Sequence, residues 1–203
     1  MKRAQCEITD RAVMDAILQR ATIGRLATTG NDGYPYITPV NYVYLDGSIY
    51  FHCARAGEKL DNIRRDPRVC FTVDIPLAYL DLGYYGDLPE PCLVHQFYHC
   101  VIIRGRAEVV DQTDEKVRAL NGLVAAHEPP GTEFPPITAE TPAVALCLVV
   151  AVRIESISGK SDLAQKKDRQ TRQRLGSYLH LRNCPGDAEA ARLLGKAGKD
   201  EAD

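Results

Sequence analysis

The chain has 203 residues, with 25 basic and 27 acidic side chains and a formal net charge of -2. This near-neutral balance excludes a nucleic-acid binder that acts through a strongly basic surface. An apolar fraction of 45% supplies enough hydrophobic material for a folded core, which excludes disorder of the chain as a whole.

The sequence also lacks the signals of membrane insertion and export. It contains no uncharged apolar run of about 18 residues, and its first seven residues have no apolar centre of the kind a signal peptide needs. The seven cysteines are odd in number and scattered, with no C-x-x-C pair. This usage is typical of reduced thiols. We therefore predict a cytoplasmic protein that associates with neither membranes nor nucleic acid.

Charge divides the chain into two parts. Residues 1–159 carry 15 basic and 20 acidic side chains, whereas residues 160–203 carry 10 and 7. The second part is rich in Lys, Arg, Gln and Ala, which predicts one or two peripheral helices. Its basic run at 166–169 is explained better by a solvated helix face than by nucleic-acid binding. We predict a folded domain over 1–159 and a basic, partly helical extension over 160–203.

The first elements are predicted to be a helix and an antiparallel meander. Thr9 or Asp10 begins the helix, and an apolar stripe runs along it. The stripe contains Val13, Ile17, Leu18 and Ala21. Three segments rich in β-branched and aromatic residues follow, over 22–28, 34–44 and 48–53. Asn/Asp-Gly pairs separate them, and such pairs favour tight hairpin turns.

The later elements alternate between strands and longer loops. A short helix is predicted over 57–65, because Pro67 disfavours helix at the residue before it. Strands are predicted over 68–74, 97–110 and 143–157, a helix over 113–127, and irregular segments over 75–91 and 129–142. About six strands with few helices between them indicate a mainly β protein, an antiparallel barrel with helices packed outside.

The junction after the third strand has the features of a phosphate site. The strand ends in His52 and Cys53, small residues follow up to Gly57, and Lys59 lies in the first turn of the next helix. Amide groups at a helix N-terminus together with one cation can bind a phosphate. The alternative is an ordinary strand–helix junction with a solvated lysine.

Short motifs between residues 23 and 160 carry a resemblance to a known family. They are Ile23–Thr28, Asp32–Pro35, Pro39–Tyr42, Tyr50–Ala54, Gly57–Leu60, Asn62–Phe71, Tyr98–Val101, Gly105–Ala107 and Ile157–Lys160. In this order and spacing the sequence resembles the FMN-binding split-barrel superfamily, which includes pyridoxamine 5'-phosphate oxidases. Within it, the sequence resembles the nitroimidazole-resistance (Nim-like) branch.

The resemblance implies an antiparallel FMN-binding split β-barrel that forms a homodimer with FMN at the interface. The residues implied to run along the isoalloxazine, mostly through their backbone, are Thr38, Pro39, Val40, Asn41 and Tyr42. Those implied to hold the ribityl phosphate are His52, Cys53 and Lys59, and Cys100 is implied to face the flavin near the dimer contact. Glu58 stands where oxidases of the family often have an arginine, and Arg55 or a basic residue of the second copy is the expected substitute.

Two polar groups allow other interpretations. His52 matches a histidine that Nim-like proteins carry and that is linked to their activity, which makes it the candidate catalytic residue; a structural histidine bound to a backbone carbonyl is the alternative. Cys92, His95, His99 and Cys100 have spacings compatible with zinc. Alternate residues of a strand face opposite ways, however, so these four cannot converge, and we predict no metal site.

The resemblance implies an FMN-dependent oxidoreductase that passes electrons from a reduced donor to a small-molecule acceptor such as a nitroaromatic. The first alternative is a non-catalytic flavin- or haem-binding protein. The second is a pyridoxamine 5'-phosphate oxidase, against which the lack of matching basic residues in 160–203 counts. The segment 75–95 is expected to be either a lid over the flavin or part of the dimer contact.

Overall fold

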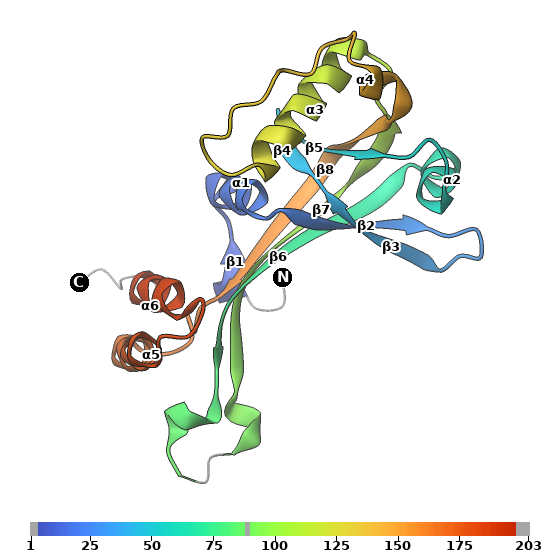
Figure 1. Ribbon diagram of the computed structural model, residues 1–203. Coiled ribbons are helices and arrows are strands. Elements are labelled where there is room, and N and C mark those ends of the chain that lie inside the picture. The colour runs from blue at the N-terminus through green and yellow to red at the C-terminus, as the bar shows by residue number, and fades with distance from the viewer. Residues whose placement is uncertain (1–3, 88–89, 198–203) are drawn as a thin grey trace. The chain divides into compact units, whose positions relative to one another are not determined.

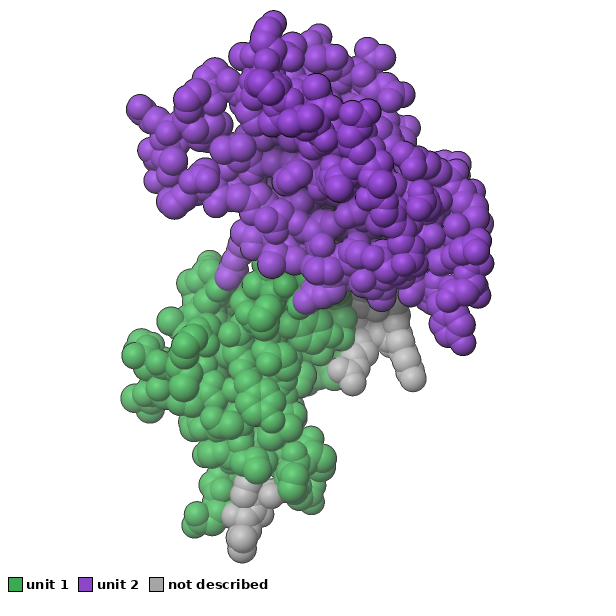
Figure 2. Space-filling view, turned by 45° about the vertical axis from the view of Figure 1, so that its right-hand side comes forward, with its two compact units in different colours: residues 1–10, 74–100, 159–203 green, residues 11–73, 101–158 purple. Residues whose placement is uncertain are grey.

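The computed structural model describes residues 4–87 and 90–197. Two compact units make up the chain (Figure 2). Unit 1 comprises residues 1–10, 74–100 and 159–203, and unit 2 comprises residues 11–73 and 101–158. The division at residue 159 into a barrel domain and an extension stays a prediction.

The described residues form an eight-stranded sheet, and the printed strand pairings in it are antiparallel (Figure 1). The strands are β1 (Glu7–Ile8), β2 (Ile23–Thr29), β3 (Pro35–Asn41), β4 (Val43–Leu45), β5 (Ser48–Cys53), β6 (Arg68–Leu80), β7 (His95–Val109) and β8 (Leu148–Asp162). Their order is β3-β2-β6-β7-β8-β5-β4, and β1 pairs with β8. The prediction of a mainly β protein with peripheral helices is confirmed.

The strand predicted over 34–44 is divided at Tyr42. β3 pairs with β2, with Thr38 opposite Leu26, whereas β4 pairs with β5. β3 and β4 therefore lie at opposite ends of the strand order although one residue separates them, so the sheet must curl. Tyr42 is 2% exposed, and its hydroxyl donates a hydrogen bond to the Leu18 carbonyl oxygen at 2.6 Å. The predicted single meander is wrong here because burying this ring redirects the chain.

The helices of the described residues lie outside the sheet. They are α1 (Arg11–Arg20), α2 (Glu58–Arg65), α3 (Thr113–His127), α4 (Pro142–Leu146), α5 (Arg169–Arg182) and α6 (Asp187–Lys196). α1 buries Met14, Ile17 and Leu18, whereas Val13 is 42% exposed. The predicted helix is confirmed, but its apolar stripe is displaced to the i, i+3, i+4 set that starts at Met14. None of the described helices is long and apolar enough to cross a membrane.

The core of unit 2 lies between α3 and the strands beneath it, where Figure 1 shows α3 lying across β4 and β5. Its buried members are Val43, Tyr50, Val110, Ala119, Leu120, Leu123, Val144, Val149 and Ala151. The four residues 149–152 of β8 are completely buried, as expected for a strand covered on both faces. Each large apolar side chain buried in this way contributes about 1.5–3 kcal/mol.

A polar cluster borders this core. The Arg153 guanidinium contacts the carboxylates of Glu108 at 2.8 Å and Glu115 at 2.7 Å, and also the Tyr50 hydroxyl at 2.9 Å. The Tyr50 hydroxyl in turn donates to Glu115. We call these four residues the Arg153 cluster. Hydrogen bonds from Tyr50 and Arg153 lower the pKa of Glu115.

Two segments differ from the sequence-based prediction. The irregular segment predicted at 75 begins later, because β6 continues to Leu80 with alternating buried and exposed residues, and two short 3-10 helices follow at Leu82–Tyr85 and Pro91–Leu93. The strand predicted over 143–157 starts at Leu148. α4 takes its first part, since Pro142 fits the first turn of a helix and cannot donate to a sheet.

Unit 1 contains the two helices predicted for the C-terminal part. α5 and α6 pack through Leu175, Leu179, Ala190 and Leu194, which are all buried (Figure 1). Gly186 begins α6 with a φ of 86°, and a Cβ there would lie 1.8 Å from the Leu77 carbonyl oxygen. Only glycine fits this close approach.

A second polar cluster holds these helices to the end of β6. The Arg182 guanidinium contacts the carboxylates of Asp81 and, at 2.6 Å, of Asp187. The Tyr178 hydroxyl donates to Asp81. We call these four residues the Arg182 cluster. Asp187 is fully buried, and the hydrogen bond from Arg182 lowers its pKa.

Candidate functional site

The candidate site of unit 2 begins where β5 ends. β5 pairs with β4 on one side and with β8 on the other, which fixes the strand up to Cys53 opposite Leu148. The His52 side chain is exposed, whereas Cys53 is half-buried. Alternation along the strand therefore sends these two neighbours to opposite faces. They cannot act together on one reacting atom.

The turn into α2 leaves room for a ligand close to the backbone. Gly57 precedes the helix with a φ of 133°, and no described heavy atom lies within 4 Å of the position that a Cβ would take. No side chain caps this end of α2. The amides of Leu60 and Asp61 donate to the Gly57 carbonyl oxygen, so the open donors are those before them. Lys59 supplies a cation there, and its ammonium lies 5.1 Å from the Phe51 ring centre.

Acidic side chains limit how much negative charge this turn can bind. Glu58 and Asp61 both lie in the first turn of α2. Asp61 is 3.3 Å from the Arg64 guanidinium, which reduces its effect. The predicted substitute cation, Arg55, is exposed and donates to the Ala145 carbonyl oxygen at 3.4 Å. Of the two predicted cations, Lys59 and Arg55, the structure therefore places Lys59 in the first turn of α2.

Cys53 is a neutral thiol in this setting. Burial raises its pKa, and the positive charge of Lys59 opposes this shift only in part. The Cys147 thiol acts in the same direction as burial. A thiol whose pKa is raised is a poor nucleophile at neutral pH. This setting therefore favours the protonated thiol of Cys53.

The edge strand β3 carries a buried polar atom that the rest of the chain does not satisfy. The Thr38 hydroxyl oxygen is buried and has no hydrogen-bond partner among the described residues. Leaving a buried hydroxyl unpaired costs about 1–3 kcal/mol. Its neighbours Ile37, Pro39 and Asn41 are exposed, and Val40 points inward. β3 also ends the strand order, so its outer backbone groups are available to a ligand or to another chain.

Asn41 and His52 line one cavity of unit 2, with a volume of about 540 Å³. The other residues that line it are Leu120, Leu123, Val124, His127, Glu128, Ile137, Ala143, Leu146 and Cys147. Its walls are mainly aliphatic, from α3, α4 and the loop between them. The polar residues are Asn41 and His52 on the β3 and β5 side and His127 and Glu128 at the end of α3. A small, mainly apolar molecule would fit between these walls.

His127 belongs to this cavity, which the sequence interpretation did not foresee. Its Nε2 lies 3.0 Å from the Tyr42 carbonyl oxygen, so the ring is held against the break between β3 and β4. A histidine in the last turn of a helix commonly serves only as a partner for the helix dipole. The helix period places His127 one turn below Leu123 and Val124, and this was the signal that it shares their buried face.

The predicted site residues thus fall into separate groups. Asn41 and His52 line the same cavity. Cys53 lies close enough to Lys59 for the positive charge to act on the pKa of the thiol. Tyr42 is buried with its hydroxyl and carbonyl both engaged, which leaves no side-chain role at the site. Cys100 belongs to unit 1. The assignment of all these residues to a cofactor stays a prediction.

The cysteines and histidines considered for zinc have other partners. His95 contacts Asp162 at 3.2 Å, and His99 contacts the Ser161 hydroxyl at 2.8 Å. The part of the chain that the structure describes contains no group of three or more potential metal ligands.

Comparison with known proteins identifies the family. A family model described as pyridoxamine 5'-phosphate oxidase matches residues 10–161. The chain belongs to this family. The match covers all the elements of unit 2 and continues to Ser161 near the end of β8. It leaves out β1, α5 and α6. No curated protein sequence matches the chain.

Solved structures share the fold. A putative 5-nitroimidazole antibiotic resistance protein from Bacteroides thetaiotaomicron is 23% identical, with a TM-score of 0.64 over 76% of this chain and 86% of that one. The flavocytochrome Anf3 from Azotobacter vinelandii is 20% identical, with a TM-score of 0.66 over 80% and 72%. A FAD- and haem-binding protein from Mycobacterium smegmatis is 19% identical, with a TM-score of 0.65 over 77% and 73%. The predicted split-barrel fold class is confirmed.

Proposed function

We propose that unit 2 binds a flavin, FMN, and that the protein is an oxidoreductase that passes electrons through it to a small-molecule acceptor such as a nitroaromatic. The observation that carries the proposal is the unpaired, buried Thr38 hydroxyl on β3. Family membership supports a ligand on this strand, because FMN is the cofactor that the resemblance implies there. The solved structure named for nitroimidazole resistance supports the class of acceptor.

The residues around α2 would hold the phosphate. The open amides before Leu60 and the Lys59 ammonium provide charge-assisted donors. Gly57 leaves the backbone accessible, and β3 would supply its outer backbone groups and the Thr38 hydroxyl to the polar edge of the ring. The flavin itself supplies the electron transfer when bound, while the protein positions it and excludes water.

FMN is proposed over FAD because this turn offers one compact phosphate site. It consists of the Lys59 ammonium and the amides at the start of α2, and Glu58 and Asp61 in the same turn leave no second cation for another phosphate. Solved relatives named for FAD share the fold, so the choice is tested directly by the nucleotide that the protein releases.

His52 is the proposed catalytic residue. Its ring is exposed at the end of β5 and lines the 540 Å³ cavity, whose aliphatic walls would accept a small planar molecule. An imidazole can act as a general acid and give a proton to an acceptor that is being reduced. The Tyr42 carbonyl oxygen holds the His127 ring, which would keep this part of the cavity wall in a fixed position.

A second copy of the chain is the proposed partner of unit 2. Unit 2 leaves Ile23, Ile37, Ile102 and Leu146 between 42% and 71% exposed. Exposed large apolar side chains gain stability when a partner covers them, and the family resemblance implies a homodimer. Light scattering of the purified protein measures the mass directly: we expect twice the chain mass, and a monomer contradicts this part of the proposal.

Replacing Lys59 tests the flavin site. In Lys59→Ala we expect FMN affinity, measured by quenching of flavin fluorescence, to fall at least tenfold, because the phosphate loses its cation. Lys59→Arg should restore most of the affinity. Arg118→Ala removes an exposed charge from α3 and should leave the affinity unchanged. If Lys59→Ala binds FMN as tightly as the parent, the phosphate assignment is wrong.

Catalysis is tested separately with the flavin-loaded protein. We expect NAD(P)H-driven reduction of a nitroaromatic, with a loss of rate but not of FMN in His52→Ala. A yellow protein that is inert with these reactants would favour non-catalytic flavin binding. A Soret band in the visible spectrum would favour the haem alternative, and oxygen consumption with pyridoxamine 5'-phosphate would favour the vitamin B6 alternative.

A further inference from the structure

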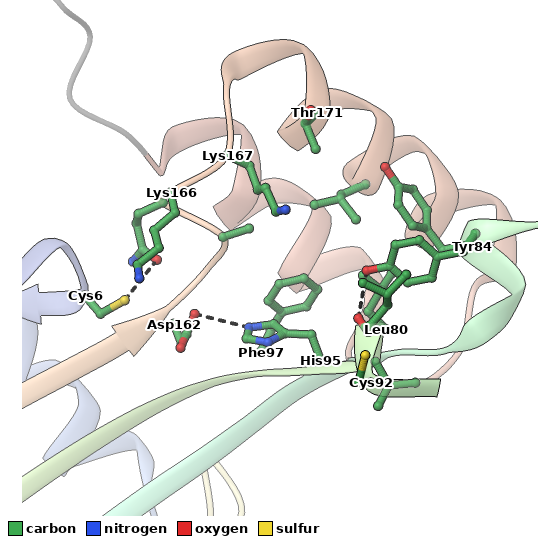
Figure 3. A pocket seen from close by; sticks show the side chains of 16 residues that line it. Cys6, Leu80, Tyr84, Cys92, His95, Phe97, Asp162, Lys166, Lys167 and Thr171 are labelled. Atoms are coloured by element: carbon green, nitrogen blue, oxygen red, sulfur yellow. Dashed lines mark hydrogen bonds and ion pairs between the residues drawn. The ribbon is translucent and has the colours of Figure 1, made fainter. Parts of the chain in front are cut away.

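Unit 1 contains a second cavity, of about 340 Å³, which shares no residue with the candidate flavin site (Figure 3). Four parts of unit 1 line it: Cys6 near the N-terminus, the residues within 80–85 and 92–97, the end of β8 with the loop after it, and the first half of α5. Small-molecule sites have volumes of about 300–1,000 Å³. This cavity is therefore large enough for a compact ligand and too small for a dinucleotide.

One wall of the cavity is apolar and aromatic. Phe97, Leu80 and Leu175 are at most 3% exposed, so they form its buried base. Tyr84 is half-buried and Tyr85 is exposed, so these two rings present the surface that a ligand can reach. Tyr84 stands further out on the same wall, and the His95 ring meets Phe97 edge to face with 5.0 Å between the ring centres. Aromatic rings set in this way favour a planar ring as their guest.

The charges around the cavity are positive in sum. Asp162 contributes one carboxylate, which contacts His95 at 3.2 Å and the Lys160 ammonium at 3.8 Å. Lys166 and Lys167 both line the cavity and are exposed. Within residues 4–87 and 90–197, no ion pair joins either of them to a carboxylate. Figure 3 shows Lys167 extending its ammonium towards the cavity.

The loop that carries these lysines is fixed in an unusual conformation. Ala164 has a φ of 58°, a left-handed conformation that is unfavourable for a non-glycine residue. The Gln165 side chain holds the loop, since it accepts from the Leu163 amide at 2.8 Å and donates to the Ser161 carbonyl oxygen at 2.6 Å. Strained residues held by their surroundings are concentrated at ligand sites. Here the strain orders the loop beside the cavity.

We propose that this cavity binds a small aromatic carboxylate of one or two rings. The ring lies against Tyr84 and Tyr85, and the carboxylate lies at the mouth beside Lys167, with the charge of Lys166 adding to the attraction. The aromatic wall selects the ring, and the two unpaired ammonium groups select a negative charge. His95, fixed by Asp162, offers its second ring nitrogen to a polar substituent. The site is independent of the flavin proposed for unit 2.

Isothermal titration of the full-length protein with 2-naphthoate tests the proposal. We expect saturable 1:1 binding to the parent and at least tenfold weaker binding to Lys166→Gln/Lys167→Gln. The matched control, Arg169→Gln/Lys196→Gln, removes two exposed charges from α5 and α6 without touching the cavity, and should bind as the parent does. The neutral analogue 2-naphthamide should bind the parent at least tenfold more weakly than the acid.

A variant that fills the cavity provides a second route to the same answer. Cys92 lines the cavity and is exposed, so Cys92→Trp occupies part of the space with little effect on the buried wall. It should abolish 2-naphthoate binding while the thermal unfolding temperature and the flavin content stay as in the parent. The proposal is overturned if the parent does not bind 2-naphthoate, if the double lysine variant binds as tightly as its control, or if Cys92→Trp leaves the affinity unchanged.

Discussion

The two units each contain an arginine that joins two carboxylates and a tyrosine, but they place this cluster differently. In the Arg153 cluster of unit 2 the arginine side chain is 39% exposed and borders a large apolar core. In the Arg182 cluster of unit 1 the arginine is 17% exposed, and one of its carboxylates, Asp187, is fully buried. Burying a charge makes its partner indispensable. Unit 1 therefore depends on its ion pairs more strongly than unit 2 does.

The reason lies in what each unit can bury. Unit 2 has α3 packed over a curled sheet, and its core holds large side chains such as Tyr50. In unit 1, α5 and α6 bury Leu175, Leu179, Ala190 and Leu194 beside the Asp187 carboxylate. The Arg182 cluster connects segments about 100 residues apart in the sequence. These two helices bury few large side chains, so they depend on such long-range connections.

The largest expected effect is the loss of Arg182. In Arg182→Met the Asp187 carboxylate stays buried without its partner, and we expect the α5–α6 region to lose about 3 kcal/mol of stability. Hydrogen exchange of residues 169–196 should then speed up more than a hundredfold, because each 1.4 kcal/mol corresponds to a factor of ten.

Arg153→Met is the matched change in unit 2. Its carboxylates can reach water, so we expect a cost of about 1 kcal/mol and roughly tenfold or less faster exchange in β8 and α3. Equal effects of the two substitutions would contradict the contrast between the units.

The smallest expected effect is a loss of stability that occurs only at acidic pH. The hydrogen bond from Arg182 lowers the pKa of Asp187 in the folded protein, so the unfolded chain takes up this proton first as the pH falls. The stability that the ionised Asp187 carboxylate contributes is complete at neutral pH. It declines as the pH falls below about 5, towards and below the ordinary pKa of an aspartate. Hydrogen exchange of α5, corrected for its intrinsic rate, should show this decline in the parent. In Asp187→Asn the decline should be much weaker; an unchanged profile would show that Asp187 is not its source.

The two units also differ in the residues that line their cavities. The unit 2 cavity has aliphatic walls and two histidines, His52 and His127, whereas the unit 1 cavity has an aromatic wall and the lysines Lys166 and Lys167 at its mouth. A neutral small acceptor suits the first, and an aromatic anion suits the second. The two are therefore tested with different probes and different variants.

Much of the fold could be predicted from local patterns. The helices over 57–65 and 113–127 were predicted within a residue of their bounds, since Pro67 stops the first and a regular apolar period marks the second. The strand from Leu148 was predicted too early, because α4 and β8 share one continuous apolar run. Hydrophobicity alone cannot separate a buried helix from a buried strand.

The candidate site was predictable where it is contiguous in sequence. His52, Gly57 and Lys59 occur within eight residues, so the strand end, open turn and helix entry could be found together. His127 could not be placed, because its contact with the Tyr42 carbonyl joins residues 85 apart.

The sequence by itself determined the mainly β class, the family and the strand–helix junction, since short-range periodicity and turn residues encode these features. The tertiary structure decided what depends on contacts between distant segments. The burial of Tyr42 divides a strand and curls the sheet, the unpaired Thr38 hydroxyl follows from its neighbours in space, and Lys167 comes beside Phe97 through the packing of α5. Such contacts depend on which surfaces the whole chain can bury together, and no local pattern specifies them.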